Sequence, residues 1–230
     1  MGRYDRQTVL AEIGEKGQQA LSEAAVLVIG VGGLGSPASL YLAAAGVGRI
    51  GLVDGDVISL SNLQRQVLYS EKEVGMPKAV CAAGRLKELS HSLKIDIYNE
   101  MLTSENSLDI ARGYDIIVDG CDNIATRYLI NDVAIKLGIP YIYGAVSEFC
   151  GQVSLFNYKN GKSYEDLYPK GSFSSTCSSA IGVIGALPGI IGSIEAMEAI
   201  KVITCAGETL RNRLLTVDSL TMEFNMYELD

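Results

Sequence analysis

The sequence predicts an α/β fold: a Rossmann-like, mostly parallel sheet flanked by helices, with an antiparallel extension at its C-terminal end. Three observations support this prediction. Up to residue 144, short apolar runs alternate with stretches of helical periodicity, as in right-handed βαβ units. A glycine-rich turn follows the first apolar run. Beyond residue 144, no helical pattern separates the last two apolar runs, which is typical of antiparallel neighbours. The 230 residues are expected to form one domain, 1–230.

The first strand is expected over 26–29 and leads directly into the sequence GVGGLG, in which Gly30, Gly32 and Gly35 match the G-x-G-x-x-G spacing. A helix of small residues and a second apolar run ending at Asp54 follow. This order of strand, glycine turn, helix and strand binds nucleotide phosphates at the helix N-terminus. Asp54 comes about 20 residues after the turn, where an acid that binds a ribose hydroxyl is expected.

The other elements follow from the same periodicities. Helices are expected over 12–23, 74–89 and 125–137. Strands are expected over 95–98, 114–119, 139–144, 152–158, 214–218 and 221–227. The segment 159–176 is expected to be a polar loop.

An uncharged stretch, 171–194, is long enough to cross a bilayer. Serines, glycines and Pro188 interrupt it, and its helical pattern continues through Glu195, Glu198 and Lys201. A buried core helix is therefore the better prediction, and no membrane partner is expected.

The composition excludes several classes of protein. Hydrophobic residues make up 48% and charged residues 20%, which is typical of a folded soluble domain. The net charge of -8 makes a nucleic-acid partner unlikely, because such proteins cluster Lys and Arg. Five scattered cysteines without a C-x-x-C pair, and no evident signal peptide, predict free thiols and a cytoplasmic location. A zinc site is not expected, because the single His91 has no ligand neighbour in sequence.

Candidate chemical groups follow three predicted strand ends, where ligands bind in open α/β sheets. These are the glycine turn, Asp54, and the segment from Asp119 to Asn123. Asp122 could bind Mg²⁺ beside phosphates, or it could simply cap the following helix. The sequence leaves these two alternatives open.

Two cations are placed to neutralise phosphates. Arg65 lies in a loop after the second strand, among neutral donors that include Asn62 and Gln66, and Lys78 lies near the start of a helix. Arg can bind phosphate through two N–H groups, whereas Lys supplies a mobile point charge.

Together these blocks resemble the E1-like superfamily of ubiquitin-activating enzymes, specifically the bacterial adenylyltransferases that activate small sulfur-carrier proteins in thiamine and molybdopterin biosynthesis. The matching blocks, in order, are RYDRQ, GVGGLGSP, LVDGDVISLSNLQRQ, VGMPKA, DGCDN with Arg127 after it, and TC before GVIG. The resemblance covers nearly the whole chain and implies one E1-like adenylation domain.

The resemblance also implies roles for individual residues. ATP and Mg²⁺ would be the ligands. The implied nucleotide-binding residues are Gly30, Gly32, Gly33, Gly35, Asp54, Asn62, Arg65, Gln66, Lys78, Asp122 and Asn123. The implied catalytic residues are Arg65, Lys78, Asp122, Cys177 and Arg6, with Asp122 as the Mg²⁺ ligand. Arg6 resembles an arginine that reaches into the neighbouring subunit's site, which implies a homodimer.

Two features vary among the members of this superfamily. Cys177 precedes the long helix, and the matching cysteine of some relatives attacks the adenylate or joins an acyl disulfide, whereas other relatives need only adenylation. Many relatives also hold a structural zinc through two C-x-x-C pairs, one of them in the loop that here spans 162–167. Both pairs are missing from this sequence, so the resemblance does not extend to zinc.

The sequence therefore predicts an ATP-dependent adenylyltransferase that activates the C-terminal Gly-Gly carboxylate of a small ubiquitin-like carrier, with the thiamine thiazole pathway favoured over molybdopterin. Three alternatives stay open: an E1-like enzyme that acts on tRNA or on a small-molecule carboxylate, an NAD-linked oxidoreductase, and a non-catalytic partner of an activating enzyme.

Overall fold

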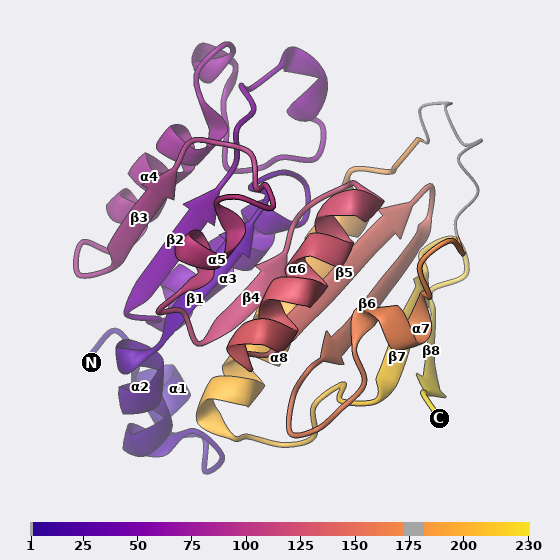
Figure 1. Ribbon diagram of the computed structural model, residues 1–230. Coiled ribbons are helices and arrows are strands. Elements are labelled where there is room, and N and C mark those ends of the chain that lie inside the picture. The colour runs from indigo at the N-terminus through magenta and orange to yellow at the C-terminus, as the bar shows by residue number, and fades with distance from the viewer. Residues whose placement is uncertain (1, 173–181) are drawn as a thin grey trace.

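The fold is built on a single sheet with helices on both faces (Figure 1). The computed structural model describes residues 2–172 and 182–230. Among these residues, eight strands pair in the order β3-β2-β1-β4-β5-β6-β7-β8. The strands are β1 (Ala25–Ile29), β2 (Arg49–Val53), β3 (Lys94–Tyr98), β4 (Ile116–Asp119), β5 (Tyr141–Ser147), β6 (Cys150–Phe156), β7 (Arg213–Asp218) and β8 (Glu223–Glu228).

The sheet has a parallel part and an antiparallel part. Strands β3, β2, β1, β4 and β5 pair in parallel, whereas β6, β7 and β8 each pair antiparallel with the preceding strand. The predicted mixed α/β fold with an antiparallel C-terminal extension is thus confirmed.

The helices form two layers. Helices α3, α4 and α8 pack on one face of the sheet, and α5, α6 and α7 pack on the other. The α-helices are α1 (Asp5–Thr8), α2 (Gly14–Glu23), α3 (Gly35–Ala45), α4 (Lys78–Leu89), α5 (Ser107–Ala111), α6 (Ile124–Leu137), α7 (Tyr164–Leu167) and α8 (Ala186–Thr204).

Strand β1 is apolar throughout because both of its faces are buried. Its successive side chains point to opposite faces, so Val26 and Val28 join the core under α3 and α8, while Leu27 and Ile29 join the core under α6. Both faces of the parallel part are covered, and such strands need a continuous apolar run.

Some predicted boundaries were wrong. The helix expected over 74–89 begins at Lys78, because Val74 and Gly75 form a turn and the extended Pro77 bridges back to Val57. Proline disfavours a helical conformation in the residue that precedes it, which explains the late start. The short helices α1, α5 and α7 lack enough turns to show a clear period, and α7 lies in the segment predicted to be a loop.

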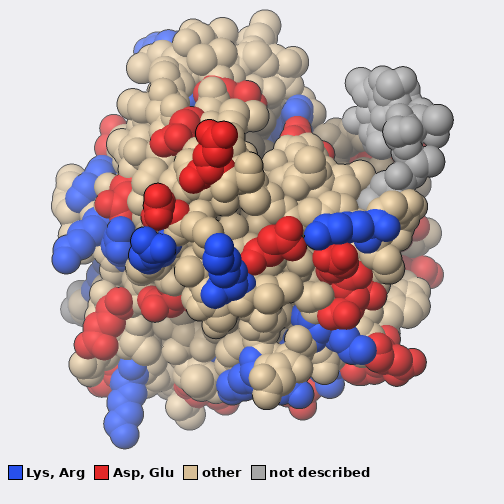
Figure 2. Space-filling model, in the orientation of Figure 1, with Lys and Arg blue, Asp and Glu red and all other residues tan. Residues whose placement is uncertain are grey.

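The long apolar segment ends in α8, as predicted. None of the helices in the described part of the chain is both long and apolar enough to cross a membrane. Helix α8 begins at Ala186 and buries both Glu195 and Glu198. On the face shown in Figure 2, basic and acidic side chains are interspersed.

Candidate functional site

A cavity of about 960 Å³ opens at the carboxyl ends of the central strands and continues over β5, β6, β7 and β8. Its nucleotide end is defined here by the sequence-predicted residues that line it, namely Gly30, Gly32, Gly33, Asp54, Arg65, Gln66, Lys78, Asp122 and Asn123. The structure therefore brings together residues that come from five separate segments of the sequence.

The glycine turn is packed too tightly for side chains. A Cβ atom on Gly30, whose φ is +84°, would lie 2.6 Å from the carbonyl oxygen of Gly120. A Cβ atom on Gly35 would lie 1.9 Å from the carbonyl oxygen of Gly30. Helix α3 begins at Gly35 without a side-chain cap. The N–H of Ser36 donates to the carbonyl oxygen of Gly32 at 3.0 Å and Pro37 has no N–H, so the donors that an anion could meet are main-chain N–H groups of the turn itself.

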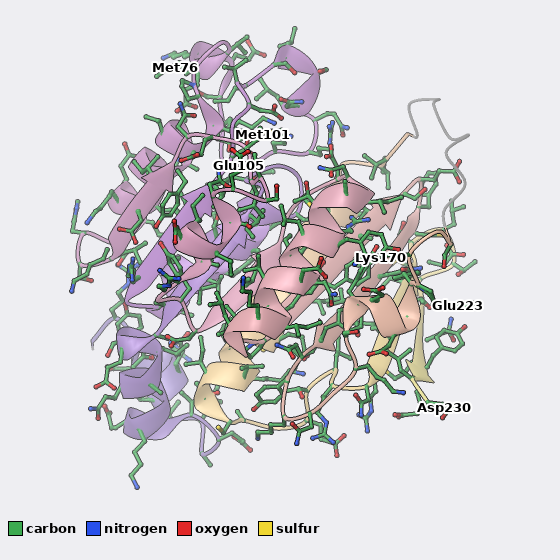
Figure 3. The ribbon with its side chains drawn as sticks, viewed as in Figure 1. Met76, Met101, Glu105, Lys170, Glu223 and Asp230 are labelled. Carbon is green, nitrogen blue, oxygen red and sulfur yellow. The ribbon has the colours of Figure 1, made fainter. Side chains whose placement is uncertain are left out.

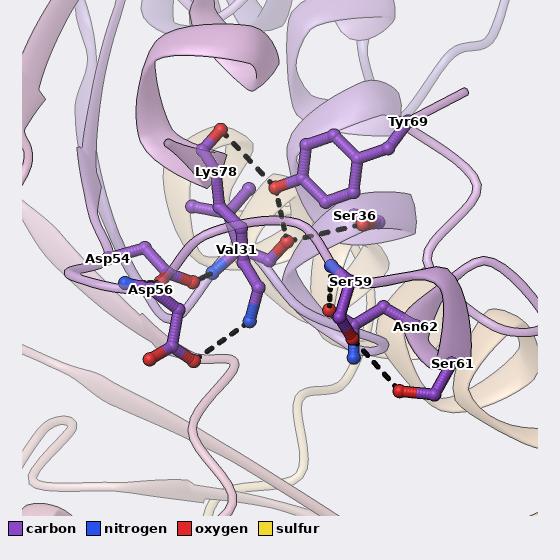
Figure 4. A network of polar contacts seen from close by, with 9 residues as sticks. All are labelled: Val31, Ser36, Asp54, Asp56, Ser59, Ser61, Asn62, Tyr69 and Lys78. Carbon is purple, nitrogen blue, oxygen red and sulfur yellow. Dashed lines mark hydrogen bonds and ion pairs between the residues drawn. The ribbon is translucent and has the colours of Figure 1, made fainter. Parts of the chain in front are cut away.

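Asp54 holds the main chain of this turn (Figure 4). Its Oδ2 accepts a hydrogen bond of 2.8 Å from the N–H of Val31, and its Oδ1 accepts one of 2.9 Å from the N–H of Asp56. On the other side, the hydroxyl of Tyr69 donates to the carbonyl oxygen of Val31 at 2.7 Å. Burial raises the pKa of Asp54, and the two N–H groups oppose this shift. Each carboxylate oxygen can still accept a further hydrogen bond, as the predicted ribose contact requires.

The two predicted cations differ in their surroundings. Lys78 is buried, and its Nζ forms an ion pair of 2.9 Å with Asp56. Arg65 donates to the carbonyl oxygen of Ser61 at 3.2 Å, and no carboxylate in the described ranges pairs with it. Beside them lies the buried Gln66, whose Oε1 has no hydrogen-bond partner within the described residues. A ligand that brings both acceptors and donors would satisfy these groups.

The loop after β4 is fixed by a buried network. Asp119 accepts hydrogen bonds from the N–H of Cys121 at 2.9 Å and from the hydroxyl of Tyr141 at 2.7 Å. Arg127 donates to the carbonyl oxygens of Cys121 at 3.1 Å and Gly144 at 3.3 Å, and its Nε lies 3.5 Å from Asp119. This network ties the loop to β5.

The network leaves Asp122 exposed at the rim of the cavity. The cap of helix α6 is Asn123, whose Oδ1 accepts a hydrogen bond of 2.8 Å from the N–H of Thr126. Of the two alternatives that the sequence left open for Asp122, helix capping is wrong. Its carboxylate has no hydrogen bond or ion pair with any described residue and faces the cavity.

The rest of the cavity is a trough along the sheet face that also carries α6 and α7. Strand register places Ala145, Gln152, Thr216 and Asn225 side by side across β5, β6, β7 and β8, and all four line the cavity. We call these four residues the neutral row. Because their side chains are small or uncharged, the trough can accept an extended, uncharged segment of chain.

Three predicted residues lie elsewhere, and a fourth cannot be placed. Gly35 packs behind the turn, and the side chain of Asn62 accepts a hydrogen bond from the N–H of Ser59 at 3.1 Å within its own turn. Arg6 lies on α1, whose Gln7 donates to the carbonyl oxygen of Ala45, at the opposite end of α3 from the glycine turn. Cys177 falls outside the described residues.

The sequence-predicted site lacks several residues that line the cavity, and four of them bear on its chemistry. Asp56 could have been found as a second acid two positions after Asp54, and Arg127 as a cation one turn into the helix after Asn123. Met101, labelled in Figure 3, comes from the segment after β3 and lines the nucleotide end. Gln152 carries no local signal, because its place depends on the pairing of strands far apart in sequence.

An aromatic cluster orders the segment in which relatives were expected to bind zinc. Tyr164 of α7 is fully buried and packs against the rings of Tyr128, Tyr141, Tyr143, Phe156 and Tyr168. Its N–H donates to Oδ1 of Asn131 on α6 at 2.9 Å. Lys170, labelled in Figure 3, adds ion pairs to Asp132 and Glu165. Packing and hydrogen bonds therefore fix this segment against α6 and the sheet.

Comparison with known proteins identifies relatives along the whole chain. The chain is 46% identical over 233 residues to the sulfur carrier protein adenylyltransferase of Thermus thermophilus, covering 97% of this chain and 85% of the relative. It is 43% identical to the probable molybdopterin-synthase adenylyltransferase of Porphyra purpurea, covering 99% of this chain and 60% of the relative. It is equally similar, at 43%, to the probable adenylyltransferase/sulfurtransferase MoeZ of Mycobacterium tuberculosis, of which it spans 59%.

Solved structures share the fold. Escherichia coli MccB bound to MccA-N7isoASN superposes with a TM-score of 0.90 at 22% identity, covering 100% of this chain and 72% of MccB. PaaA superposes with a TM-score of 0.85 at 21% identity, covering 99% of this chain and 72% of PaaA. The family match covers residues 4–230, and together with the Thermus relative it shows that the chain belongs to the ThiF family.

Proposed function

We propose that this protein is an ATP-dependent adenylyltransferase that activates the C-terminal carboxylate of a small ubiquitin-like sulfur carrier. The single observation that supports this proposal most strongly is the shape of the cavity: the same hollow joins the glycine turn to the trough that contains the neutral row. An oxidoreductase would need a second pocket for a nicotinamide ring rather than a path for a peptide.

The nucleotide end suits ATP. The glycine turn before α3 offers main-chain N–H groups to phosphate, while Met101, Leu102 and Ile124 give the cavity an apolar wall for a base. Arg65 and Lys78 supply positive charge for the phosphates. Lys78 would exchange or share its contact with Asp56 when a phosphate arrives.

Asp122 is the residue that would hold Mg²⁺. Its exposed carboxylate lacks a partner among the described residues, and carboxylate oxygen is a ligand that this hard cation prefers. When bound, the ion would neutralise charge on the phosphates. The Asp119–Arg127 network keeps the loop in place, so Asp122 is positioned before any ligand enters.

The chemistry needs no nucleophile from the protein. An oxygen of the carrier's carboxylate attacks the α-phosphorus of ATP, the bond from that phosphorus to the bridging oxygen breaks, and pyrophosphate leaves. The carboxylate is already ionised at neutral pH, so positioning and charge stabilisation supply the catalysis. The sequence shows no histidine-containing catalytic group such as a Ser-His-Asp triad, which agrees with this mechanism.

The carrier's tail would lie in the trough. Three strand spacings of about 4.8 Å separate β5 from β8, so the neutral row spans roughly the length of four extended residues. A tail ending in Gly-Gly has no side chains at the reacting end, and this suits a narrow path between the sheet and the tyrosines that cover it.

A second copy of the chain would complete the active site. The stretch 35–45 of α3 has no charged residue, and Tyr41 of α3 and Met197 of α8 are 57% and 54% exposed on the layer that these two helices form. Such apolar surface favours an interface. Arg6 lies far from the cavity of its own chain, and a dimer across this layer would let it act in its neighbour's site.

Pyrophosphate exchange tests the proposed reaction. Sulfur carriers of the thiamine and the molybdopterin pathways, each ending in Gly-Gly, are supplied separately with ATP, Mg²⁺ and labelled pyrophosphate. We expect label to enter ATP with one of the carriers, which also identifies the pathway, and we expect Asp122→Ala and Arg65→Ala to abolish it. Exchange that survives both substitutions would overturn the site assignment.

Subunit mixing tests the dimer. Arg6→Ala and Asp122→Ala are each expected to be inactive, and a mixture of the two variants should regain exchange, because a mixed dimer has one site with both residues intact. A monomeric mass in sedimentation, with full activity of Arg6→Ala, would contradict the proposal.

A further inference from the structure

The side chain of Gln152 is held in one orientation by two tyrosines. Its Oε1 accepts a hydrogen bond of 2.6 Å from the hydroxyl of Tyr168 and one of 3.3 Å from the hydroxyl of Tyr143. Both tyrosine rings belong to the aromatic cluster around Tyr164, so packing limits their movement. The carbonyl end of the Gln152 amide is therefore engaged with the protein.

The amino end of the same amide faces the trough. Gln152 is half-buried at the centre of the neutral row, between Ala145 of β5 and Thr216 of β7, and it lines the cavity. No acceptor within the described residues binds its Nε2. With the carbonyl end occupied, the group that Gln152 offers to a ligand is a pair of N–H donors.

A neutral donor selects a particular kind of partner. Its complement is an oxygen acceptor, and in an extended peptide these acceptors are main-chain carbonyl oxygens. The row contains no charged side chain. The charged residue next to it in the cavity lining is Asp218, two residues after Thr216 on β7, and a carboxylate does not attract a carbonyl oxygen, so it cannot replace this contact. A hydrogen bond at this position would fix how far the peptide advances towards the nucleotide end.

We propose that Gln152 sets the register of the carrier's tail by donating a hydrogen bond from Nε2 to a main-chain carbonyl oxygen of its last residues. This inference rests on the proposed function and deepens it. Tyr168 acts as a positioning residue, because its hydroxyl fixes which end of the amide meets the substrate.

The test uses Gln152→Glu in the pyrophosphate-exchange assay, with the carrier that supports exchange by the wild-type protein. The substituted side chain has the same shape, and both tyrosine hydroxyls can still donate to it, but its donors are gone and an oxygen faces the peptide carbonyl. We expect the KM for the carrier to rise at least about tenfold, which corresponds to about 1.4 kcal/mol, because an unmatched polar pair replaces the hydrogen bond. The KM for ATP and the melting temperature should stay near their wild-type values.

Asn225→Asp is the matched control. It adds the same charge to the same row, on the outermost strand, without altering the amide that the tyrosines hold. We expect a much smaller rise in the KM for the carrier. Equal rises in both variants would show a general effect of charge in the trough and would overturn the inference.

Tyr168→Phe supplies a further check on orientation. Loss of its hydroxyl lets the amide of Gln152 rotate, so the KM for the carrier should rise by a few-fold. When Tyr168→Phe is added to the Gln152→Glu variant, the KM for the carrier should not rise further.

An unchanged KM for the carrier in Gln152→Glu would overturn the inference while the proposed reaction stands. A wild-type protein that binds ATP but gives no exchange with any Gly-Gly carrier would instead overturn the proposed function.

Discussion

Glu195 of α8 packs directly against Gly144 of β5: a Cβ atom on Gly144 would lie 2.4 Å from Oε1 of the glutamate. Gly144 belongs to the strand that forms one wall of the cavity, and its carbonyl oxygen accepts a hydrogen bond from Arg127. The carboxyl group of Glu195 is fully buried, and neither of its oxygens has a hydrogen-bond partner within the described residues.

Replacing Glu195 by Gln should stabilise the protein at neutral and alkaline pH. Burial raises the pKa of Glu195 well above its usual value, and the charge of Asp119 raises it further. The folded state therefore retains a proton that the unfolded chain releases above a pH of about 4.3, so the wild-type stability falls as pH rises from there towards the folded pKa. Gln has no proton to release, and chemical denaturation should show its advantage growing by up to about 1.4 kcal/mol per pH unit between pH 5 and 8.

Glu198→Gln is the control on the same helix. Glu198 is also buried, but it pairs with Lys201 and accepts a hydrogen bond of 2.7 Å from the N–H of Leu210. Its loss of charge should destabilise the protein at pH 8. A Glu195→Gln variant that is less stable than wild type at pH 8 would contradict the assignment of a neutral carboxyl.

Gly144→Ala should destabilise the fold through overpacking. The added methyl group would overlap a carboxyl that has no room to move, and overpacking of this kind costs about 1–3 kcal/mol. Adding Glu195→Ala should restore much of the loss, so a double-mutant cycle measured by urea denaturation should give a clear coupling energy. Strictly additive effects of the two changes would argue that they do not share this space.

Two substitutions of Tyr164 should separate the contribution of its ring to stability from the contribution of its hydroxyl. The ring is fully buried, while its hydroxyl has no partner within the described ranges. Tyr164→Phe should therefore keep or slightly increase stability, whereas Tyr164→Ala should cost about 3–5 kcal/mol. Thermal unfolding of the two variants measures the difference, and equal losses would show that the hydroxyl matters.

Chelation should leave the melting temperature unchanged. Packing of Tyr164 and the contact from its N–H to Asn131 hold helix α7 against α6 and the sheet, without the cysteine pairs that the sequence lacks. We expect identical thermal unfolding with and without EDTA in excess. A fall in the melting temperature, reversed by added zinc, would show that a metal contributes.

Substitutions of two neighbouring residues in the loop between β4 and α6 should have different effects: one should lower stability and the other should abolish activity. Asn123 caps α6, so Asn123→Ala should lower the free energy of unfolding by about 1 kcal/mol. Asp122→Ala removes a side chain without partners in the described part of the chain, so exchange should be lost at unchanged stability. A strong fall in melting temperature for Asp122→Ala would assign that residue a structural role instead.

The sequence was sufficient to predict most of the nucleotide end because its signals are local. The spacing of Gly30, Gly32 and Gly35 reflects close contacts within one strand-turn-helix unit, and the strand that ends at Asp54 belongs to the same βαβ unit. Parallel strands then bring Asp122 to the same edge of the sheet. Every group found this way lies at the end of an element that its own periodicity predicts.

Other features depend on contacts that have no local pattern. The pairing of Lys78 with Asp56 changes a predicted free cation into an ion pair, and it depends on the path of the loop between them. The neutral row forms only because β5, β6, β7 and β8 pair in one particular register. In the sequence, both α7 and α8 lie between Gln152 of β6 and Thr216 of β7. The burial of Tyr164 likewise depends on tertiary packing, because this residue lies in the segment 159–176 that the sequence predicts to be a polar loop.

The main chain of Val31 has both of its polar groups engaged, its N–H with Asp54 and its carbonyl with Tyr69. The glycine turn thus holds its shape before any ligand arrives. Nucleotide binding then loses little free energy to ordering the turn, because the donors that meet the phosphates are already aligned. We expect nucleotide to bind in a single step without a slow closing phase, at a rate that is proportional to nucleotide concentration and changes with ionic strength.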